Sequence, residues 1–317
     1  MRLYSIVLLF VLLISQSVLV SANNQSIRIG IDLWPGYYPV ILAKHLNLFK
    51  KRNLIVDIVL PEDTDNMLQD FTSGKLDLVC VAMGDAFSLK AEDPNLKVVM
   101  ITDESAGGDA LLGNPEDLSS LKGRKIGTNL DGFGELFVKA FLEKGGLSLN
   151  DVSLVHQEAS DAIHFLQEGR ADVVHTWEPY VTEVVSFNAG DVLFDSSHTP
   201  GLIPDSLLAN GKTIRHNPKA LRLFIEAWLE AVDWWLDHRV KGDSIIESEL
   251  VLMPGSVNLE GVRLYTKNDN IEAFRLGQSM TSLHHVTNIY IDFFRKKGGL
   301  NSGLKSIDFL DSRFLPK

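Results

Sequence analysis

A degenerate internal repeat constrains the fold of this chain more than any other feature of its sequence. Residues 71–79 read FTSGKLDLV and residues 166–174 read LQEGRADVV, so a glycine, a basic residue, an aspartate and a valine recur at the same spacing. In each copy a helical segment ends at the glycine, the chain turns, and a buried strand begins. A second pair, IRIGIDLWPG at 27–36 and RKIGTNLDGFGE at 124–135, puts a glycine-containing loop between a strand and a helix. The repeats predict two similar lobes.

Strand and helix patterns alternate along the chain, which predicts an α/β fold with largely parallel strands. In such sheets ligands bind where strands lead into helices, so two lobes are expected to face each other across a cleft. We expect residues 23–105 to form the first part of lobe 1 and residues 106–200 to form lobe 2. Residues 201–317 are expected to return to lobe 1 and to add C-terminal helices. A helix beginning at Pro218 is predicted by apolar residues at helical spacing. These are Leu221, Phe224, Ile225, Trp228, Val232 and Trp235.

The first 22 residues have the pattern of a secretory signal peptide. Arg2 precedes an apolar run from Leu3 to Ile14, and small residues follow up to Ala22. A short basic start, an apolar centre and small residues predict export with cleavage after Ala22. The alternative is that this segment is retained as a membrane anchor, but Ser15, Gln16 and Ser17 interrupt the run, and a spanning helix needs about 20 apolar residues.

Charge and residue types exclude several functions. The formal net charge of -11 disfavours nucleic acid and anionic membranes as partners. Cys80 is the only cysteine, so no internal disulfide is expected. Histidines 156, 164 and 175 fall on different predicted elements, and neither a metal-ligand motif nor a nucleophile elbow is present. The sequence therefore predicts no catalytic residue, no metal site and no cofactor.

Four stretches resemble a known class of proteins. They are RIGIDLWPGYYPVILAKHLNLFKKRNLIVDIV at 28–59, FTSGKLDLV at 71–79, LKGRKIGT at 121–128 and LQEGRADVVHTWEPYVTEV at 166–184. They are similar to solute-binding proteins of ABC importers of the nitrate, sulfonate and taurine class, which includes binders of thiamine-precursor pyrimidines. The resemblance implies a two-lobed periplasmic-binding-protein fold of type II that closes on a small molecule in the cleft.

The same resemblance implies a non-enzymatic monomer in the periplasm that delivers its ligand to an ABC permease. The alternative partner is a transmembrane kinase or cyclase that reads the closed, ligand-bound form. The sequence does not separate these two partners, because each would recognise the surface of a lobe rather than the ligand loops.

The resemblance places the ligand among five segments, at 32–38, 84–88, 103–109, 131–135 and 177–180. Their candidate ligand-binding residues are aromatic or acidic: Trp34, Tyr37, Tyr38, Asp32, Asp85, Asp109, Phe133, Glu135, Trp177 and Glu178. None of the segments contains Lys or Arg. Aromatic faces attract cations, whereas carboxylates at helix N-termini repel oxyanions, so an amine, a zwitterion or a nitrogen heterocycle is favoured over a sulfonate. Alternatively, several of these carboxylates only cap helices.

Overall fold

The computed structural model describes residues 25–61, 64–114, 118–298 and 303–317. The predicted signal segment, residues 1–22, lies outside the described residues. Within the described part of the chain, no helix is long and apolar enough to cross a membrane.

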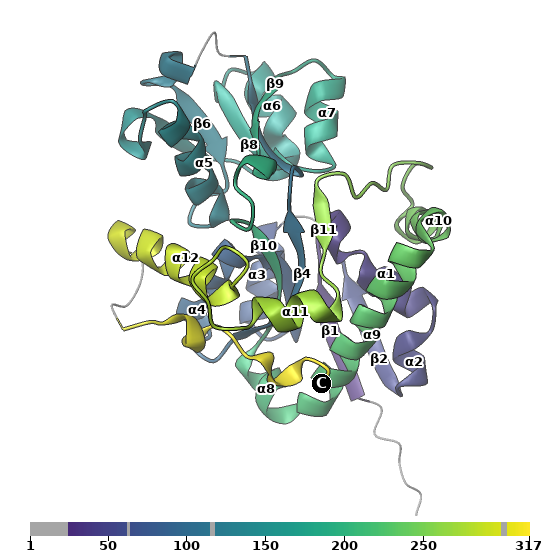
Figure 1. Ribbon diagram of the computed structural model, residues 1–317. Coiled ribbons are helices and arrows are strands. Elements are labelled where there is room, and N and C mark those ends of the chain that lie inside the picture. Colours follow the sequence, from purple (N-terminus) through teal and green to yellow (C-terminus); the bar gives the residue numbers. More distant parts are fainter. Residues whose placement is uncertain (1–24, 62–63, 115–117, 299–302) are drawn as a thin grey trace, which may run out of the picture.

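The larger lobe, lobe 1, is built on a six-stranded sheet with the strand order β11-β4-β10-β3-β1-β2 (Figure 1). Its strands are β1 (Gln25–Gly30), β2 (Leu54–Val59), β3 (Leu78–Ala82), β4 (Lys97–Ser105), β10 (Pro204–Ala209) and β11 (Val262–Leu264). Its helices are α1 (Pro39–His45), α2 (Leu48–Lys51), α3 (Thr64–Thr72), α4 (Ala86–Glu92), α8 (Gly211–His216), α9 (Pro218–Asp237), α10 (Arg239–Leu250), α11 (Lys267–Ala273) and α12 (Leu283–Lys297).

Lobe 2 forms the upper part of Figure 1 and contains a five-stranded sheet with the order β7-β6-β8-β5-β9. Its strands are β5 (Asp109–Gly113), β6 (Lys125–Thr128), β7 (Ser153–His156), β8 (Val173–Trp177) and β9 (Asp191–Asp195). Its helices are α5 (Phe133–Lys144), α6 (Ala162–Gln167) and α7 (Tyr180–Ser186). The described residues thus form two α/β lobes, as the repeats predicted.

The aspartate of the internal repeat has the same structural role in both lobes. In lobe 1 the Asp77 carboxylate accepts a hydrogen bond from the Arg28 backbone N–H at 2.9 Å, and the Asp77 N–H donates to the Arg28 carbonyl at 2.8 Å. In lobe 2 Asp172 makes the same two bonds with Lys125, both at 2.9 Å. Because each aspartate ties the turn before one strand to its parallel neighbour, the repeat reflects folding rather than ligand binding.

Helix α9 supplies much of the core of lobe 1, as its apolar spacing predicted. Trp228 and Trp235 on this helix are fully buried, and the ring of Phe224 stacks on Phe49 of α2 with 5.2 Å between centroids. Burying side chains of this size contributes on the order of 2–3 kcal/mol each. These tryptophans are therefore part of the core and not of a ligand site.

The chain crosses between the lobes at residues 106–108 and 196–203, and the strand after each crossing runs in reverse. Strand β5 is antiparallel to β8 and β9, and β10 is antiparallel to β3 and β4. The prediction of largely parallel strands needs this correction. The chain enters each lobe at the cleft edge of its sheet, so the next strand must run away from the cleft, and its first residues, including Asp109 and Asp205, lie at that edge.

Candidate functional site

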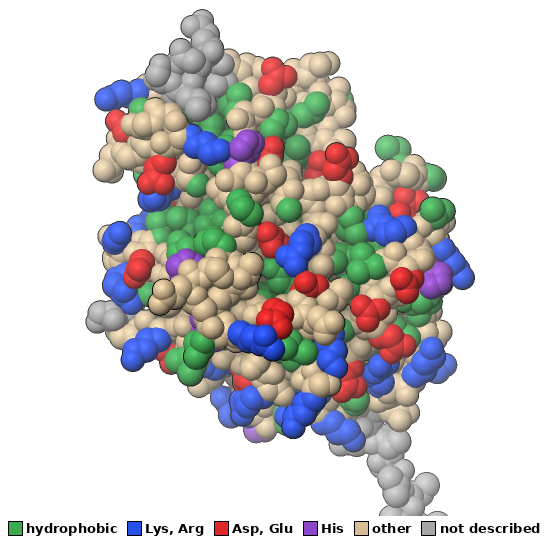
Figure 2. Space-filling model, in the orientation of Figure 1, with side chains coloured by type: hydrophobic (Ala, Val, Ile, Leu, Met, Phe, Trp, Pro, Cys, Tyr) green, Lys and Arg blue, Asp and Glu red, His purple; other side chains and the backbone are tan. Residues whose placement is uncertain are grey.

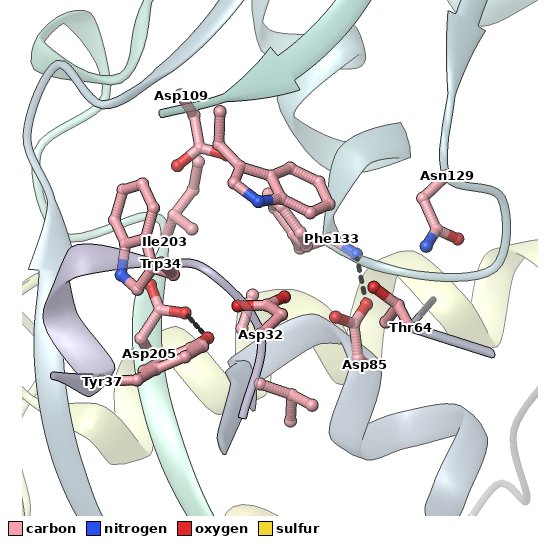
Figure 3. A pocket seen from close by; sticks show the side chains of 13 residues that line it. Asp32, Trp34, Tyr37, Thr64, Asp85, Asp109, Asn129, Phe133, Ile203 and Asp205 are labelled. Carbon is pink, nitrogen blue, oxygen red and sulfur yellow. Dashed lines mark hydrogen bonds between the residues drawn. The ribbon is translucent and has the colours of Figure 1, made fainter. Parts of the chain in front are cut away.

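A cavity lies between the two lobes and is lined by residues from both (Figure 3). Lobe 1 and the crossing contribute Asp32, Trp34, Tyr37, Thr64, Val81, Ala82, Asp85, Ile203 and Asp205, and lobe 2 contributes Asp109, Asn129, Phe133 and Trp177. The empty volume between these walls is about 400 Å³, but the space open to the centres of water-sized molecules is only about 30 Å³. At roughly 10–15 Å³ for each water, this cavity holds about two water molecules or a small chemical group.

Four carboxyl groups line this cavity, and no Lys, Arg or His among the described residues does. Asp32 points into the centre of the cavity in Figure 3. Its Oδ1 atom is buried and has no hydrogen-bond partner. A buried carboxylate oxygen without a partner is costly, because it has lost water and gained nothing in exchange. The cavity therefore favours a group that donates hydrogen bonds or carries positive charge.

Burial raises the pKa of three of these carboxyl groups, Asp32, Asp85 and Asp205, and favours their protonated form. Burial raises the pKa of Asp32 to about 7, against a hydrogen bond from the Trp34 backbone, and the charge of Asp109 raises it further. Burial likewise raises the pKa of Asp85 to about 7, although the Phe133 backbone N–H opposes the rise. The pKa of Asp205 lies well above its ordinary value because of burial and the nearby Asp103. Loss of water outweighs the available hydrogen bonds at all three groups.

The aromatic loop after β1 is anchored to lobe 1 by its polar atoms. The indole Nε1 of Trp34 donates a hydrogen bond to Asp103 Oδ1 at 2.8 Å, and the Tyr37 hydroxyl donates to Asp205. A Cβ atom on Gly36 would lie 1.9 Å from the Asp103 carboxylate, so this turn needs a glycine to approach β4 closely. The loop thus presents the rings of Trp34 and Tyr37 to the cavity in fixed positions.

Lobe 2 supplies an aromatic wall and one buried histidine that contacts Asp109. The rings of Phe133 and Trp177 lie 5.9 Å apart between centroids, and His175 lies behind them. His175 Nε2 is 3.3 Å from Asp109 Oδ1, and its Nδ1 is 3.1 Å from the Thr128 hydroxyl. Asp109 therefore faces the cavity while a buried imidazole holds its other side.

Two polar contacts join the lobes beside the cavity. The Asp85 carboxylate of lobe 1 accepts a hydrogen bond at 3.3 Å from the N–H of Phe133, the first residue of α5. Lys297 at the end of α12 lies 2.8 Å from Asp131 Oδ1 and 2.6 Å from Glu135 Oε1 of lobe 2. These contacts join the two lobes in the arrangement that the structure shows.

Lys297→Met is expected to favour lobe opening and to weaken ligand binding roughly threefold to tenfold, because it leaves the buried Glu135 without its cation. The measurements are the radius of gyration of the empty protein by X-ray scattering and the dissociation constant of any ligand found. Lys139→Met is the matched control, since Lys139 pairs with Glu143 within lobe 2 at 2.6 Å. An unchanged radius and affinity would show that the ion pair does not stabilise closure.

Three predicted ligand residues lie outside the cavity. Tyr38 is buried and precedes α1, and it is absent from the cavity wall, which Tyr37 joins instead. Glu135 accepts a hydrogen bond at 2.8 Å from the Asp131 N–H, in addition to its ion pair with Lys297. Glu178 accepts hydrogen bonds from the N–H and hydroxyl of Thr182, at 3.1 and 3.0 Å, in the first turn of α7. These two glutamates satisfy local backbone donors, the alternative that the sequence left open.

The other predicted residues meet in the cavity, and the structure adds some that the sequence reasoning missed. Asp32, Trp34, Tyr37, Asp85, Asp109, Phe133 and Trp177 all line it. The additions include Asp205, Asn129 and Thr64. Asp205 was missed because it directly follows the return crossing, far along the chain from the recognised loops. Its signal was available, since it follows the turn at 199–203 and is the second residue of a buried strand.

Comparisons with known proteins place the sequence in a family. The family model described as NMT1/THI5 like matches residues 34–241. A protein of Brucella abortus named as a binding protein is 23% identical over 221 residues, which cover 67% of this chain and 68% of that protein. A 4-amino-5-hydroxymethyl-2-methylpyrimidine phosphate synthase of Candida albicans is 27% identical over 238 residues, 69% of each chain.

The fold has counterparts among solved structures. The alkanesulfonate-binding protein of Xanthomonas axonopodis superposes with a TM-score of 0.72 at 15% identity, covering 90% of this chain and 97% of that one. This likeness confirms the two-lobed fold of periplasmic solute-binding proteins that the sequence resemblance implied. Since the family model spans more than half of the sequence, the chain belongs to the NMT1/THI5-like family.

Proposed function

We propose that this protein is an exported, non-catalytic solute-binding protein that captures a small amine, zwitterion or nitrogen heterocycle by lobe closure and delivers it to an ABC importer. The observation that carries the proposal is the cavity between the lobes, in which four carboxyl groups and four aromatic residues meet, with no basic side chain among the described residues that line it. Carboxylates pair with ammonium groups, and aromatic faces add roughly 0.5–2 kcal/mol for each well-placed ring.

The geometry disfavours an oxyanion at the position where helices most readily bind one. The N-terminus of α5 faces the cleft, but Asp85 accepts a hydrogen bond from its Phe133 N–H. A Cβ atom on Gly132, the residue before the helix, would lie 2.2 Å from Asp85 Oδ1, so the carboxylate occupies the available space. A sulfonate or nitrate would have to displace this group and tolerate the remaining carboxylates. On the face shown in Figure 2, Lys and Arg side chains are scattered over both lobes, and none of the described ones is among the residues that line the cavity.

The mechanism is a shift of population towards the closed form. A cation between Asp32 of lobe 1 and Asp109 of lobe 2 contacts both lobes only when they approach each other. The ligand therefore binds the closed form more tightly and increases its share, and a permease that recognises this form receives loaded protein. The fold and the family support this role, and the signal-like segment supports export to the periplasm. A membrane sensor as the partner stays a prediction from the sequence.

A thermal-shift screen of the chain from Asn23 onward tests the proposed function. The panel holds amines and betaines, amino acids, pyrimidines and related heterocycles, alkanesulfonates and nitrate. A ligand at about a hundred times its dissociation constant stabilises the folded form by roughly 2.7 kcal/mol, which is readily measured. Amines or heterocycles are expected to shift the melting temperature. A shift with sulfonates alone would contradict the proposed ligand class while leaving a solute-binding role intact.

Trp177→Leu is expected to weaken ligand binding at least tenfold, because it removes an aromatic face from the cavity but keeps an apolar side chain in its place. Isothermal titration of the ligand found in the screen gives the change. Trp234→Leu is the matched control, since the Trp234 ring, near the end of α9, stacks on His238 with 4.7 Å between ring centroids, outside the cavity wall. Equal affinities of the two variants would show that the Trp177 ring does not contribute to ligand binding.

A further inference from the structure

A cavity of about 570 Å³ lies on lobe 1, away from the cleft. Its walls come from α4, the loop between α4 and β4, helix α8 and the C-terminal segment 303–317. Helix α8 and the C-terminus lie at the lower end of lobe 1 in Figure 1, opposite lobe 2. Of the described residues, none lines both this cavity and the one between the lobes. The volume is that of a site for a small organic molecule.

Four basic side chains line this cavity, in a chain whose formal net charge is -11. They are Lys90, Lys97, Arg215 and Arg313, and we call the cavity they line the basic cavity. The acidic residues of its wall are Asp308 and Asp311. The Asp311 carboxylate accepts hydrogen bonds from Nε and Nη2 of Arg313, at 2.8 and 2.6 Å. Arg313 therefore has its counterion within the wall.

Lys90 and Lys97 are held close together by neutral acceptors. Both ammonium groups donate a 2.7 Å hydrogen bond to the Asp308 carbonyl oxygen, so the two nitrogens lie at most twice that distance apart. Lys90 is only 6% exposed and also donates to the Leu96 carbonyl at 2.8 Å. Within the described chain, neither ammonium group forms an ion pair with a carboxylate. Two positive charges at this separation repel each other, and a carbonyl oxygen does not neutralise them.

The carboxylates that act on Lys90 from a distance are engaged with other groups. Asp93 and Asp308 accept hydrogen bonds from backbone N–H groups, at 2.6 to 2.9 Å. Burial and the charge of Lys97 lower the pKa of Lys90 to about 8, against the attraction of Asp308 and Asp93. The protein thus leaves the positive charge of the lysine pair incompletely balanced.

Arg215, near the end of α8, adds a guanidinium group without a partner to the same wall. It makes no hydrogen bond or ion pair with any residue that the structure describes. A guanidinium presents its N–H groups as a planar fork that matches two oxygens of a phosphate or a carboxylate. Each lysine ammonium has three donors, and Lys90 uses two of them on backbone carbonyls. Donors and positive charge therefore remain available to an anion in this cavity.

We propose that the basic cavity binds an oxyanion with two or more negative charges, held by Lys90, Lys97 and Arg215. A phosphate or a polycarboxylate meets this requirement, because each offers oxygens at the spacing of the guanidinium fork. The anion connects α4, α8 and the C-terminal segment and neutralises the lysine pair. This second site lies outside the cleft and does not depend on the proposed ligand of the cleft.

Calorimetry at neutral pH and constant ionic strength tests the proposal. The chain from Asn23 onward is titrated with pyrophosphate, citrate and acetate, and sodium chloride balances the ionic strength. Pyrophosphate or citrate is expected to bind at least tenfold more tightly than acetate, because it presents more negative charge to three cations. The tighter of the two identifies phosphate or carboxylate as the preferred group. An absence of binding by both multivalent anions would overturn the proposal.

Arg215→Gln provides the second arm of the experiment. The substitution breaks no contact with a described residue, so the variant is expected to fold normally and to bind the anion at least tenfold more weakly. Lys212→Gln is the matched control, because Lys212 is exposed on the same helix but does not line the cavity. Equal weakening by both substitutions would indicate general charge attraction and overturn the site. Anion binding that Arg215→Gln leaves unchanged would place the anion elsewhere and would equally overturn it.

Discussion

The empty protein is expected to become more stable when the pH is lowered from 7.5 to 5.5, opposite to the usual acid destabilisation. The cause is the group of buried carboxyls, since the pKa values of Asp32, Asp85 and Asp103 are raised from 3.8 to about 7. A carboxyl with a raised pKa keeps its proton in the folded protein at pH values at which the unfolded chain has already lost it. Its contribution to stability is therefore full below the unfolded value near 4 and is lost as the pH rises through 7.

Each such carboxyl changes the free energy of unfolding by roughly 2 kcal/mol between these pH values. The lowered pKa values of Asp151, Asp269 and Asp311 act below this window, because they fall beneath the ordinary value of 3.8. The lowered pKa of His284 opposes the effect, since the unfolded chain gains that proton first as the pH falls. The effect on stability of several carboxyls with raised pKa values is expected to outweigh that of one half-buried histidine with a lowered pKa. Urea denaturation at the two pH values measures the difference, and a less stable protein at pH 5.5 would contradict it.

Ligand affinity is expected to change in the opposite direction. A cation requires ionised carboxylates, so its binding releases protons and weakens by roughly 20-fold for each such carboxyl between pH 7.5 and 5.5. A neutral heterocycle that accepts a hydrogen bond from a protonated carboxyl would instead bind more tightly at the lower pH. Titrations in buffers of different ionisation enthalpy count the protons released. The sign of the pH dependence thus distinguishes the two ligand classes retained in the proposed function.

Asp32→Asn is expected to raise the stability of the empty protein at pH 7.5 while lowering affinity for a cationic ligand roughly 10- to 100-fold. The substitution removes a buried negative charge that burial disfavours, which gives about 1–3 kcal/mol of stability. The asparagine oxygen still accepts the hydrogen bond from the Trp34 backbone. The lost affinity is that of a charge-assisted hydrogen bond, roughly 1.5–3 kcal/mol.

The control for this variant is Asp57→Asn. Asp57 lies on β2 beside β1, and its exposed carboxylate is 3.1 Å from the Arg28 Nε atom. Little change in either stability or affinity is expected there, because exposed ion pairs contribute little. Melting temperatures and titrations of both variants provide the measurements. A destabilised Asp32→Asn protein with unchanged affinity would show that Asp32 is a structural carboxyl.

Local patterns predicted the elements and the loops that carry the site. The repeated turns with Asp77 and Asp172 identified two similar α/β units, because their short-range hydrogen bonds leave a recognisable spacing. Trp34, Phe133 and Trp177 could be assigned to strand ends and the helix starts that follow them for the same reason, and they line the cavity. These features depend on a few neighbouring residues, which is the range over which periodicity and turn chemistry are informative.

The contacts across the cleft could not be predicted in this way. Glu135 and Asp85 have the same sequence signature, an acid beside a helix start, yet Glu135 pairs with Lys297 while Asp85 lines the cavity. Lys297 lies 162 residues from Glu135, and no local pattern links the two. The sequence by itself determined the fold class, the two lobes and the acidic, aromatic character of the loops. Only the tertiary structure decided which carboxylates line the cavity, because that choice depends on which donors and cations distant parts of the chain bring to each acid.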